Sequence, residues 1–151
     1  MICTGEYLVR QCRDYITDMT PEFSIEMTED DIAAEKERSE DKSYSDGYYE
    51  SLAFYRKLCD KIPDRGIILF HSCAVAVDGK AYLFTAPSGT GKSTHASLWK
   101  EILGERVRII NGDKPLIRVT PGHITVYGTP WNGKERWGEN SHADTFLDFI
   151  K

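Results

Sequence analysis

The segment 86–93 contains the residues best suited to chemistry. It reads Ala-Pro-Ser-Gly-Thr-Gly-Lys-Ser, which matches the phosphate-loop pattern G-x-x-x-x-G-K-[ST] except that a small alanine stands first. Gly89 and Gly91 allow backbone conformations in which amide N–H groups converge on an anion. Lys92 supplies charge to the β- and γ-phosphates, and the Ser93 hydroxyl is a ligand for the Mg²⁺ that bridges them. The pattern predicts binding of a nucleoside triphosphate, ATP with Mg²⁺. The expected nucleotide contacts are Ser88, Gly89, Thr90, Gly91, Lys92, Ser93 and Thr94.

Asp113 is the residue expected to hold the metal together with Ser93. A phosphate-loop protein usually carries such an acid after an apolar strand next to the loop, and Asp113 follows the apolar segment 107–110. A simple turn between strands is the alternative interpretation of the run Asn-Gly-Asp at 111–113. A dinucleotide-binding fingerprint is excluded, because its third glycine would fall at Thr94.

The elements around the loop are expected to follow the order of a nucleotide-binding α/β core. A helix over 92–103, closed by Gly104, should begin directly after the loop. Before the loop, two apolar runs flank Asp-Gly-Lys at 78–80, which predicts a β-hairpin. Such a hairpin is unusual in ordinary phosphate-loop proteins. Strands are expected over 66–70, 73–77, 81–85, 107–110, 116–119 and 124–127, the first of them fully buried.

The first 64 residues differ in composition, because charged and aromatic residues replace the β-branched runs found later. We therefore expect a small α+β region over 1–64 and a phosphate-loop core over 65–151. Alternating apolar residues predict short strands over 6–11 and 22–27.

Two helices are expected within this first region. Thr28 has the pattern of an N-cap followed by an acidic first turn, so a helix should cover 29–40. A second helix should begin at Asp46 and stop before Pro63. Its apolar stripe has helical spacing and is expected to face the core rather than a nucleotide. The stripe consists of Tyr48, Leu52, Tyr55 and Leu58, widened by Tyr49 and Phe54.

Charge and composition narrow the classes of partner. The net charge of −5 gives no electrostatic reason to expect nucleic acid. No apolar run has the length of a membrane span, and the N-terminus lacks the apolar core of a signal peptide, so we expect a cytoplasmic protein without a membrane partner. The four cysteines are widely spaced. Reduced structural thiols are the favoured interpretation, with a zinc site or a disulfide framework as the alternatives.

From His71 to Thr94 the chain resembles the nucleotide-binding region of HPr kinase/phosphorylase-related proteins, which share their phosphate-loop architecture with the phosphoenolpyruvate carboxykinases. The resemblance runs from about Gly66 to Trp137 and includes Asn-Gly-Asp-Lys-Pro at 111–115 and Gly-Thr-Pro-Trp-Asn-Gly-Lys at 128–134. It implies strands wrapped around the loop, with a hairpin before it. The implied activity is kinase-like transfer of the γ-phosphoryl group of ATP to a hydroxyl of a protein serine or a small molecule.

The resemblance also implies catalytic residues, namely Asp113, Lys92 and His71. His71 matches a histidine near the reacting phosphate, although an ordinary strand-end histidine is an equally good interpretation. Lys134 is a candidate for stabilising charge on the transferring phosphate, or else a solvated loop lysine. A carboxykinase is less favoured, because its substrate site needs several arginines. Those that follow the loop are Arg106, Arg108, Arg118 and Arg136.

Two departures from the family pattern favour a second hypothesis, a nucleotide-binding regulatory or remnant protein with impaired catalysis. The family carries two adjacent acids after the apolar strand, but here Gly112 stands in place of the first, and glycine cannot take a proton. Family members also continue well beyond Trp137, so the core is expected to be incomplete at its C-terminal end. An incomplete sheet would leave edges that a second copy of the chain can cover.

The last residues are expected to form a short amphipathic helix over 141–151 in place of further sheet. Ala143, Phe146, Leu147 and Ile150 stand at i, i+3, i+4 and i+7, which is helical spacing. A helix of this length needs packing against apolar surface to be stable.

Overall fold

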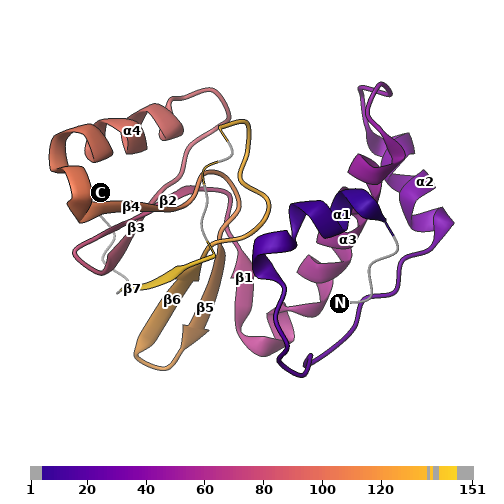
Figure 1. Ribbon diagram of the computed structural model, residues 1–151, viewed down its shortest axis with the longest axis horizontal. Coiled ribbons are helices and arrows are strands. Elements are labelled where there is room, and N and C mark those ends of the chain that lie inside the picture. Colours follow the sequence, from indigo (N-terminus) through magenta and orange to yellow (C-terminus); the bar gives the residue numbers. More distant parts are fainter. Residues whose placement is uncertain (1–4, 136, 138–139, 146–151) are drawn as a thin grey trace. The chain divides into compact units, whose positions relative to one another are not determined.

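The computed structural model describes residues 5–135, 137 and 140–145 (Figure 1). The chain divides into two compact units, Met1–Ile62 and Pro63–Lys151. The fold is mixed α/β. In the described residues the first unit is helical, and the second holds a seven-stranded, mostly antiparallel sheet with one α-helix.

The first unit contains α1 (Glu6–Gln11), α2 (Glu29–Arg38) and α3 (Asp46–Lys61), with a short 3-10 turn at Arg13–Tyr15. The strand predicted over 6–11 is wrong, because these residues form α1. Leu8 and Cys12 are both buried, and their i, i+4 spacing suits one helix face as well as strand alternation.

The strand predicted over 22–27 is also wrong. Lysine ammonium groups, not a neighbouring strand, donate to two of its backbone carbonyls: Lys61 to Ser24 and Lys57 to Glu26. The α+β interpretation of the first region therefore fails for its described residues, where the regular elements are helical.

Both predicted helices of this unit are confirmed. The Thr28 hydroxyl accepts from the Asp31 N–H and the Asp31 carboxylate accepts from the Thr28 N–H, which makes a capping box at the start of α2. At the start of α3, Ser45 accepts from the N–H of Tyr48. The start of each helix is therefore determined locally, since the capping partners lie within three residues of each other.

The buried face of α3 matches the predicted apolar stripe only in part. Tyr49 and Phe54 of that stripe are buried, whereas its other members are only half-buried, namely Tyr48, Leu52, Tyr55 and Leu58. The other buried residues of α3 are Glu50, Ser51 and Ala53. Both α1 and α2 contact α3, and Ser51 donates to the Gln11 side chain of α1. Contacts with two neighbouring helices extend the buried face of α3 to Glu50, Ser51 and Ala53, beyond the apolar stripe.

The sheet of the second unit has the order β1-β5-β6-β7-β3-β2-β4. Its strands are β1 (Ile67–Leu69), β2 (Cys73–Val77), β3 (Lys80–Phe84), β4 (Val107–Asn111), β5 (Leu116–Thr120), β6 (His123–Tyr127) and β7 (His142–Thr145), with 3-10 turns at Pro63–Arg65 and Gly104–Arg106. Neighbouring strands run antiparallel except β3 and β7. The predicted hairpin is confirmed, because Asp78 and Gly79 take φ of 50° and 82° between β2 and β3, as a tight I′-type turn requires.

Each face of the β2–β3–β4 part of the sheet covers its own apolar cluster. On one face, α4 (Lys92–Leu103) packs over the sheet (Figure 1). That cluster contains Cys73, Val75, Val77, Ala96, Val107 and Ile109, flanked by Tyr82, Phe84, Trp99, Leu103 and Trp137. The opposite face forms an inner cluster of Ala74, Ala76, Ala81, Ile110, Val126 and Ala143. β4 and β6 contact each other although three strands lie between them in the sheet order, so the sheet curls around this cluster.

The segment 66–70 is a strand but not a fully buried one. It forms β1 at the end of the sheet with β5 as its neighbour, and Ile68 is 45% exposed. An edge position explains the exposure, because one flank of the strand has no strand beside it in the described sheet.

The helix predicted over 141–151 is contradicted where the structure describes it. Residues His142–Thr145 form β7, which pairs antiparallel with β6 and parallel with β3. Ala143 is buried while His142 and Asp144 are exposed, which is strand alternation. The helical spacing also depended on Phe146, Leu147 and Ile150, which lie outside the described residues.

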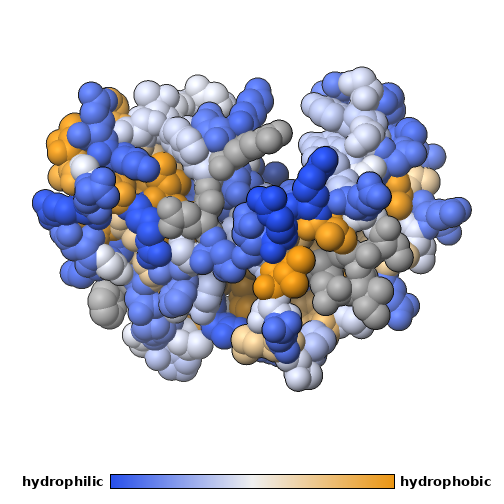
Figure 2. Space-filling view, viewed as in Figure 1, coloured by the Kyte–Doolittle hydropathy of each residue, from blue (hydrophilic) through white to orange (hydrophobic). Residues whose placement is uncertain are grey.

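The outer surface carries apolar side chains over α4, where Leu98 and Ile102 are exposed (Figure 2). No helix in the described part of the chain has the length and hydropathy needed to cross a membrane.

Candidate functional site

The topology of the sheet gathers the predicted site residues at one end. Strand β2 runs antiparallel to both β3 and β4, so its first residues lie beside the last residues of those strands. His71 precedes β2, the loop 86–91 follows β3, and Asp113 follows β4. Residues far apart in sequence therefore meet at the same end of the sheet. One contact between them is direct: the Thr85 hydroxyl donates to the backbone oxygen of His71 at 3.3 Å.

The glycine-rich loop 86–91 leads directly into α4. Gly89 and Gly91 have φ of 81° and 95°, a region that L side chains rarely adopt, so the expectation that both glycines take special backbone conformations is confirmed. The helix begins at Lys92 and ends at Leu103 before Gly104, as predicted. In the described structure no side chain caps the N-terminus of α4. Its first amide groups are thus available to an anion.

The side chain of Lys92 folds back over this loop. Its ammonium donates to the backbone oxygens of Ala86 at 2.8 Å and Pro87 at 3.3 Å. Thr90 also donates its hydroxyl to Pro87 O, at 2.7 Å. A phosphate would therefore compete with loop carbonyls for Lys92. Of the other predicted contacts, Ser88, Thr90 and Thr94 are exposed and Ser93 is half-buried.

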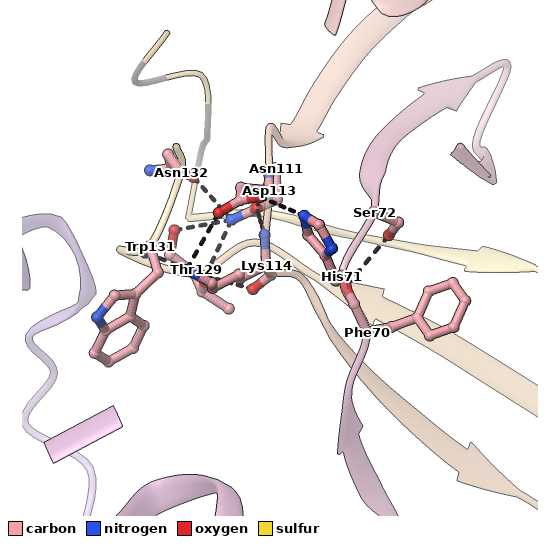
Figure 3. Close-up of polar contacts among 9 residues, drawn as sticks. All are labelled: Phe70, His71, Ser72, Asn111, Asp113, Lys114, Thr129, Trp131 and Asn132. Atoms are coloured by element: carbon pink, nitrogen blue, oxygen red, sulfur yellow. Dashed lines mark hydrogen bonds and ion pairs between the residues drawn. The ribbon is translucent and has the colours of Figure 1, made fainter. Parts of the chain in front are cut away.

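Asp113 and His71 face one another across the end of the sheet (Figure 3). His71 Nε2 lies 3.0 Å from Asp113 Oδ1, and Lys114 Nζ lies 3.3 Å from Asp113 Oδ2. The N–H of Ser72 donates to the backbone oxygen of Asp113 at 3.0 Å, which ties the two segments together. Both carboxylate oxygens of Asp113 therefore already have cationic or N–H partners, and a metal ion would have to displace one of them.

Gly112 is packed too closely against other backbone to be replaced freely. Its N–H donates to Trp137 O at 2.8 Å, and a Cβ at this position would lie 2.7 Å from the backbone oxygen of Asn132. Since real Cβ atoms essentially never approach an atom so closely, an acid at residue 112 needs the backbone to move. Residue 112 is therefore a glycine because there is no room for a side chain, and not because its φ is unusual.

The pKa of the Cys73 thiol is affected by charged side chains near this end of the sheet. The thiol is fully buried, and its pKa is raised from 9.0 to about 11, chiefly by this burial. The carboxylates of Glu135 and Asp113 contribute to this rise in pKa, while the ammonium of Lys92 opposes it. Lys92 and Asp113 thus act on the same thiol, although one begins α4 and the other follows β4. Lys134 is exposed, in the turn formed by residues 133–135.

The donor set suits Mg²⁺ bound together with phosphates better than a metal held by protein alone. Among the described residues there is no group of three or more His, Cys, Asp and Glu side chains that could hold a metal ion. Ser93 and Asp113 would supply one hydroxyl and one carboxylate. Mg²⁺ commonly takes only one or two carboxylates, filling its other positions with water and substrate phosphates.

Sequence reasoning assigned no role to Asn111, which is fully buried beneath the site. Its amide contacts the backbone of residues 113 and 114 and the segment 129–132. β4 also contains the polar Arg108, so a polar residue at the end of this strand gave no distinctive signal. No protein-family model, no curated protein and no solved structure matches this chain. The residues and their geometry are therefore the basis for a functional proposal.

Proposed function

We propose that the chain binds ATP with Mg²⁺ through residues 88–94 and transfers the γ-phosphoryl group to a hydroxyl of a protein serine or a small molecule. The observation that carries the proposal is the meeting of three elements at one end of the sheet. These are the glycine-rich loop with the uncapped start of α4, the charge of Lys92, and the His71–Asp113 pair.

The loop and the helix start supply the phosphate-binding part. Gly89 and Gly91 have the positive φ that turns successive amide groups toward one point, and the helix dipole adds positive potential there. A Cβ at Gly89 would meet nothing within 4 Å, so the loop is open on that side. Lys92 exchanges its contacts with two carbonyl oxygens for stronger, charge-assisted contacts with the β- and γ-phosphates.

The His71–Asp113 pair supplies the part that handles the acceptor. Transfer forms a bond from the acceptor oxygen to the γ-phosphorus and breaks the bond from that phosphorus to the β–γ bridging oxygen, releasing ADP. The acceptor proton passes to the hydrogen-bonded pair of His71 and Asp113, whose nearest atoms are 3.0 Å apart. Bound Mg²⁺ would neutralise charge on the β- and γ-phosphates, with Ser93 and Asp113 as its protein ligands. The remaining contribution is positioning.

We infer the finer fold assignment on the same grounds. A β-hairpin that leads straight into the loop supports a core of the HPr kinase/carboxykinase type, because strands then surround the loop. The resemblance over residues 66–137 points the same way.

The alternative function is nucleotide binding without efficient turnover, and a specific observation favours it. Gly112 stands where the resembled family has the first of its two adjacent acids, and the carbonyl of Asn132 leaves no room for a side chain there. The His71–Asp113 pair would then be the proton acceptor left at the site. Under this alternative, ATP binds at the loop but the γ-phosphoryl group stays in place.

Calorimetry with Mg-ATP tests the binding step. Lys92→Ala should weaken the affinity at least several-fold, because it removes the charge next to the β- and γ-phosphates. Lys100→Ala is the matched control, since Lys100 is an exposed lysine in the last turn of the same helix and should bind like wild type. Equal affinities for wild type and Lys92→Ala, with unchanged circular dichroism, would refute the assignment. Single-turnover transfer from labelled ATP to candidate acceptors then separates the kinase from the non-turnover alternative.

A further inference from the structure

The end of β4 contains a β-bulge that redirects one side chain. Val75 pairs with Ile109, but the next residue along β2, Ala74, pairs with Asn111, so Ile110 is the extra residue. Residues directly opposite each other in an antiparallel pair project from the same face. Asn111 therefore shares the face of Ala74 and the inner cluster, not the face of Ile109 that packs under α4.

The Asn111 amide is fully buried and its orientation is determined by its partners (Figure 3). Its Oδ1 accepts from the N–H of Asp113 at 2.8 Å and the N–H of Lys114 at 2.7 Å. Its Nδ2 faces three oxygens: Thr129 O and Oγ1, both at 3.0 Å, and Asn132 Oδ1 at 2.7 Å. Two amide hydrogens are shared among these three acceptors. Only a side chain that accepts on one side and donates on the other satisfies this set.

Thr129 closes the network into a ring. Its hydroxyl accepts from Asn111 Nδ2 and donates to the backbone oxygen of Lys114 at 2.8 Å, while the N–H of Lys114 donates back to Asn111. The backbone on both sides of the Asp113 side chain is therefore held by one buried amide. A ring of mutually supporting hydrogen bonds is more rigid than its separate members.

We propose that Asn111 is a positioning residue for the Asp113 carboxylate, and so for the metal ion that Asp113 holds. The inference rests on the proposed function, which makes Asp113 a Mg²⁺ ligand. Asn111 contacts neither nucleotide nor metal in this arrangement. It acts through the backbone of residues 113 and 114, which it aligns so that the carboxylate lies between His71 and Lys114. Losing a partner that orients a metal ligand typically lowers metal affinity about 10–100-fold.

The test compares ATP binding with and without Mg²⁺ by calorimetry, because the two affinities separate the loop from the metal ligand. In Asn111→Leu, which keeps the branched shape without polar atoms or charge, the gain in affinity caused by Mg²⁺ should fall about tenfold. Affinity for Mg²⁺-free ATP should stay within about twofold of wild type, since the loop 86–93 is untouched. Thr129→Val removes the ring hydroxyl with almost no change of shape, and should lower the same gain by a smaller factor. It replaces Asn111→Leu as the deciding variant if the latter does not fold.

A double-mutant cycle with Asp113→Asn distinguishes positioning from a general structural role. If Asn111 acts through Asp113, Asn111→Leu should have no further effect on the Mg²⁺ response once Asp113 is changed. Equal losses from Asn111→Leu in both backgrounds would overturn the proposal. If Asp113→Asn abolishes the Mg²⁺ response while both Asn111→Leu and Thr129→Val bind like wild type, the role of Asn111 alone is wrong. If Asp113→Asn leaves the response unchanged, the metal role of Asp113 and this inference fail together, whereas phosphate binding at Lys92 stands.

Discussion

His71 Nε2 and Asp113 Oδ1 lie 3.0 Å apart, although one residue precedes β2 and the other follows β4. A second pair in the same unit has similar geometry, because His123 Nε2 lies 3.0 Å from Asp144 Oδ1. The first pair lies at the end of the sheet next to the glycine-rich loop, whereas the second bridges β6 and β7. The same substitution can therefore be made in a histidine–aspartate pair beside the glycine-rich loop and in one away from it, and the effects on activity can be compared.

We predict that His71→Asn lowers single-turnover phosphoryl transfer at least tenfold, because it removes the partner that orients Asp113 and shares the acceptor proton. His123→Asn should stay within about twofold of wild type. The rates are measured with labelled ATP at saturating acceptor. Equal effects of the two substitutions would mean that His71 is an ordinary strand-end histidine.

Gly112→Asp should destabilise the protein rather than restore a missing base. A Cβ at this position meets the Asn132 carbonyl, and relieving such a contact typically costs about 1–3 kcal/mol. Gly112→Ala should lower the melting temperature to a similar extent, since it adds the same Cβ without a carboxylate. A Gly112→Asp protein that melts like wild type and transfers phosphate about 10²–10⁴-fold faster would contradict this prediction and identify residue 112 as the site of a lost base.

The capping box of α2 should weaken in acid. The Lys57 ammonium, then the hydroxyl and the N–H of Thr28, lower the pKa of Asp31 from 3.8 to about 2. A carboxyl whose pKa is lower in the folded state contributes stability above its unfolded pKa and loses that contribution as the pH falls. Helix content should therefore decline between about pH 4 and pH 2, as followed by far-UV circular dichroism.

Two substitutions isolate this effect from the other carboxylates. Asp31→Asn should remove part of the acid transition, because the titrating group is gone. Asp30→Asn, at the exposed neighbouring position in the same first turn, should leave the transition as in wild type. Identical acid curves for both variants would show that the capping box does not control α2.

Cys73 should resist thiol reagents in the folded protein. The thiolate is the reactive species, and a pKa of about 11 leaves almost none of it at neutral pH. In a Cys3→Ser background, iodoacetamide at pH 7.5 should label the half-buried Cys59 well before Cys73, as located by peptide mass spectrometry. Labelling of Cys73 at the rate of Cys59 would mean that the end of β2 opens readily.

Several local features follow from the sequence because their causes lie within a few residues. The hairpin at Asp78 and Gly79 needs only residues that tolerate positive φ. The start of α2 depends on Thr28 and Asp31, three positions apart. The helix that follows the glycine-rich loop begins and ends at the predicted residues for the same reason.

The site could be predicted in part. The loop glycines and Lys92 carry a recognisable pattern, and Asp113 could be chosen because an acid follows an apolar strand. The pairing of Asp113 with His71 was open, since it depends on β2 running antiparallel to β4. The role of Asn111 was out of reach, because a single bulge at Ile110 turns its side chain to the opposite face.

The sequence by itself determined the local elements and the chemical character of the loop, because both depend on short-range backbone preferences and on residue type. Tertiary structure decided three other features. The segment 142–145 is a strand because β3 and β6 offer backbone partners on both sides, which outweighs the helical spacing of its apolar residues. The segment 6–11 is a helix that packs against α3, where the Ser51 hydroxyl donates to the Gln11 side chain. Gly112 has no room for a side chain because residues 132 and 137 pass beside it. Such contacts join distant parts of the chain, and no local pattern records them.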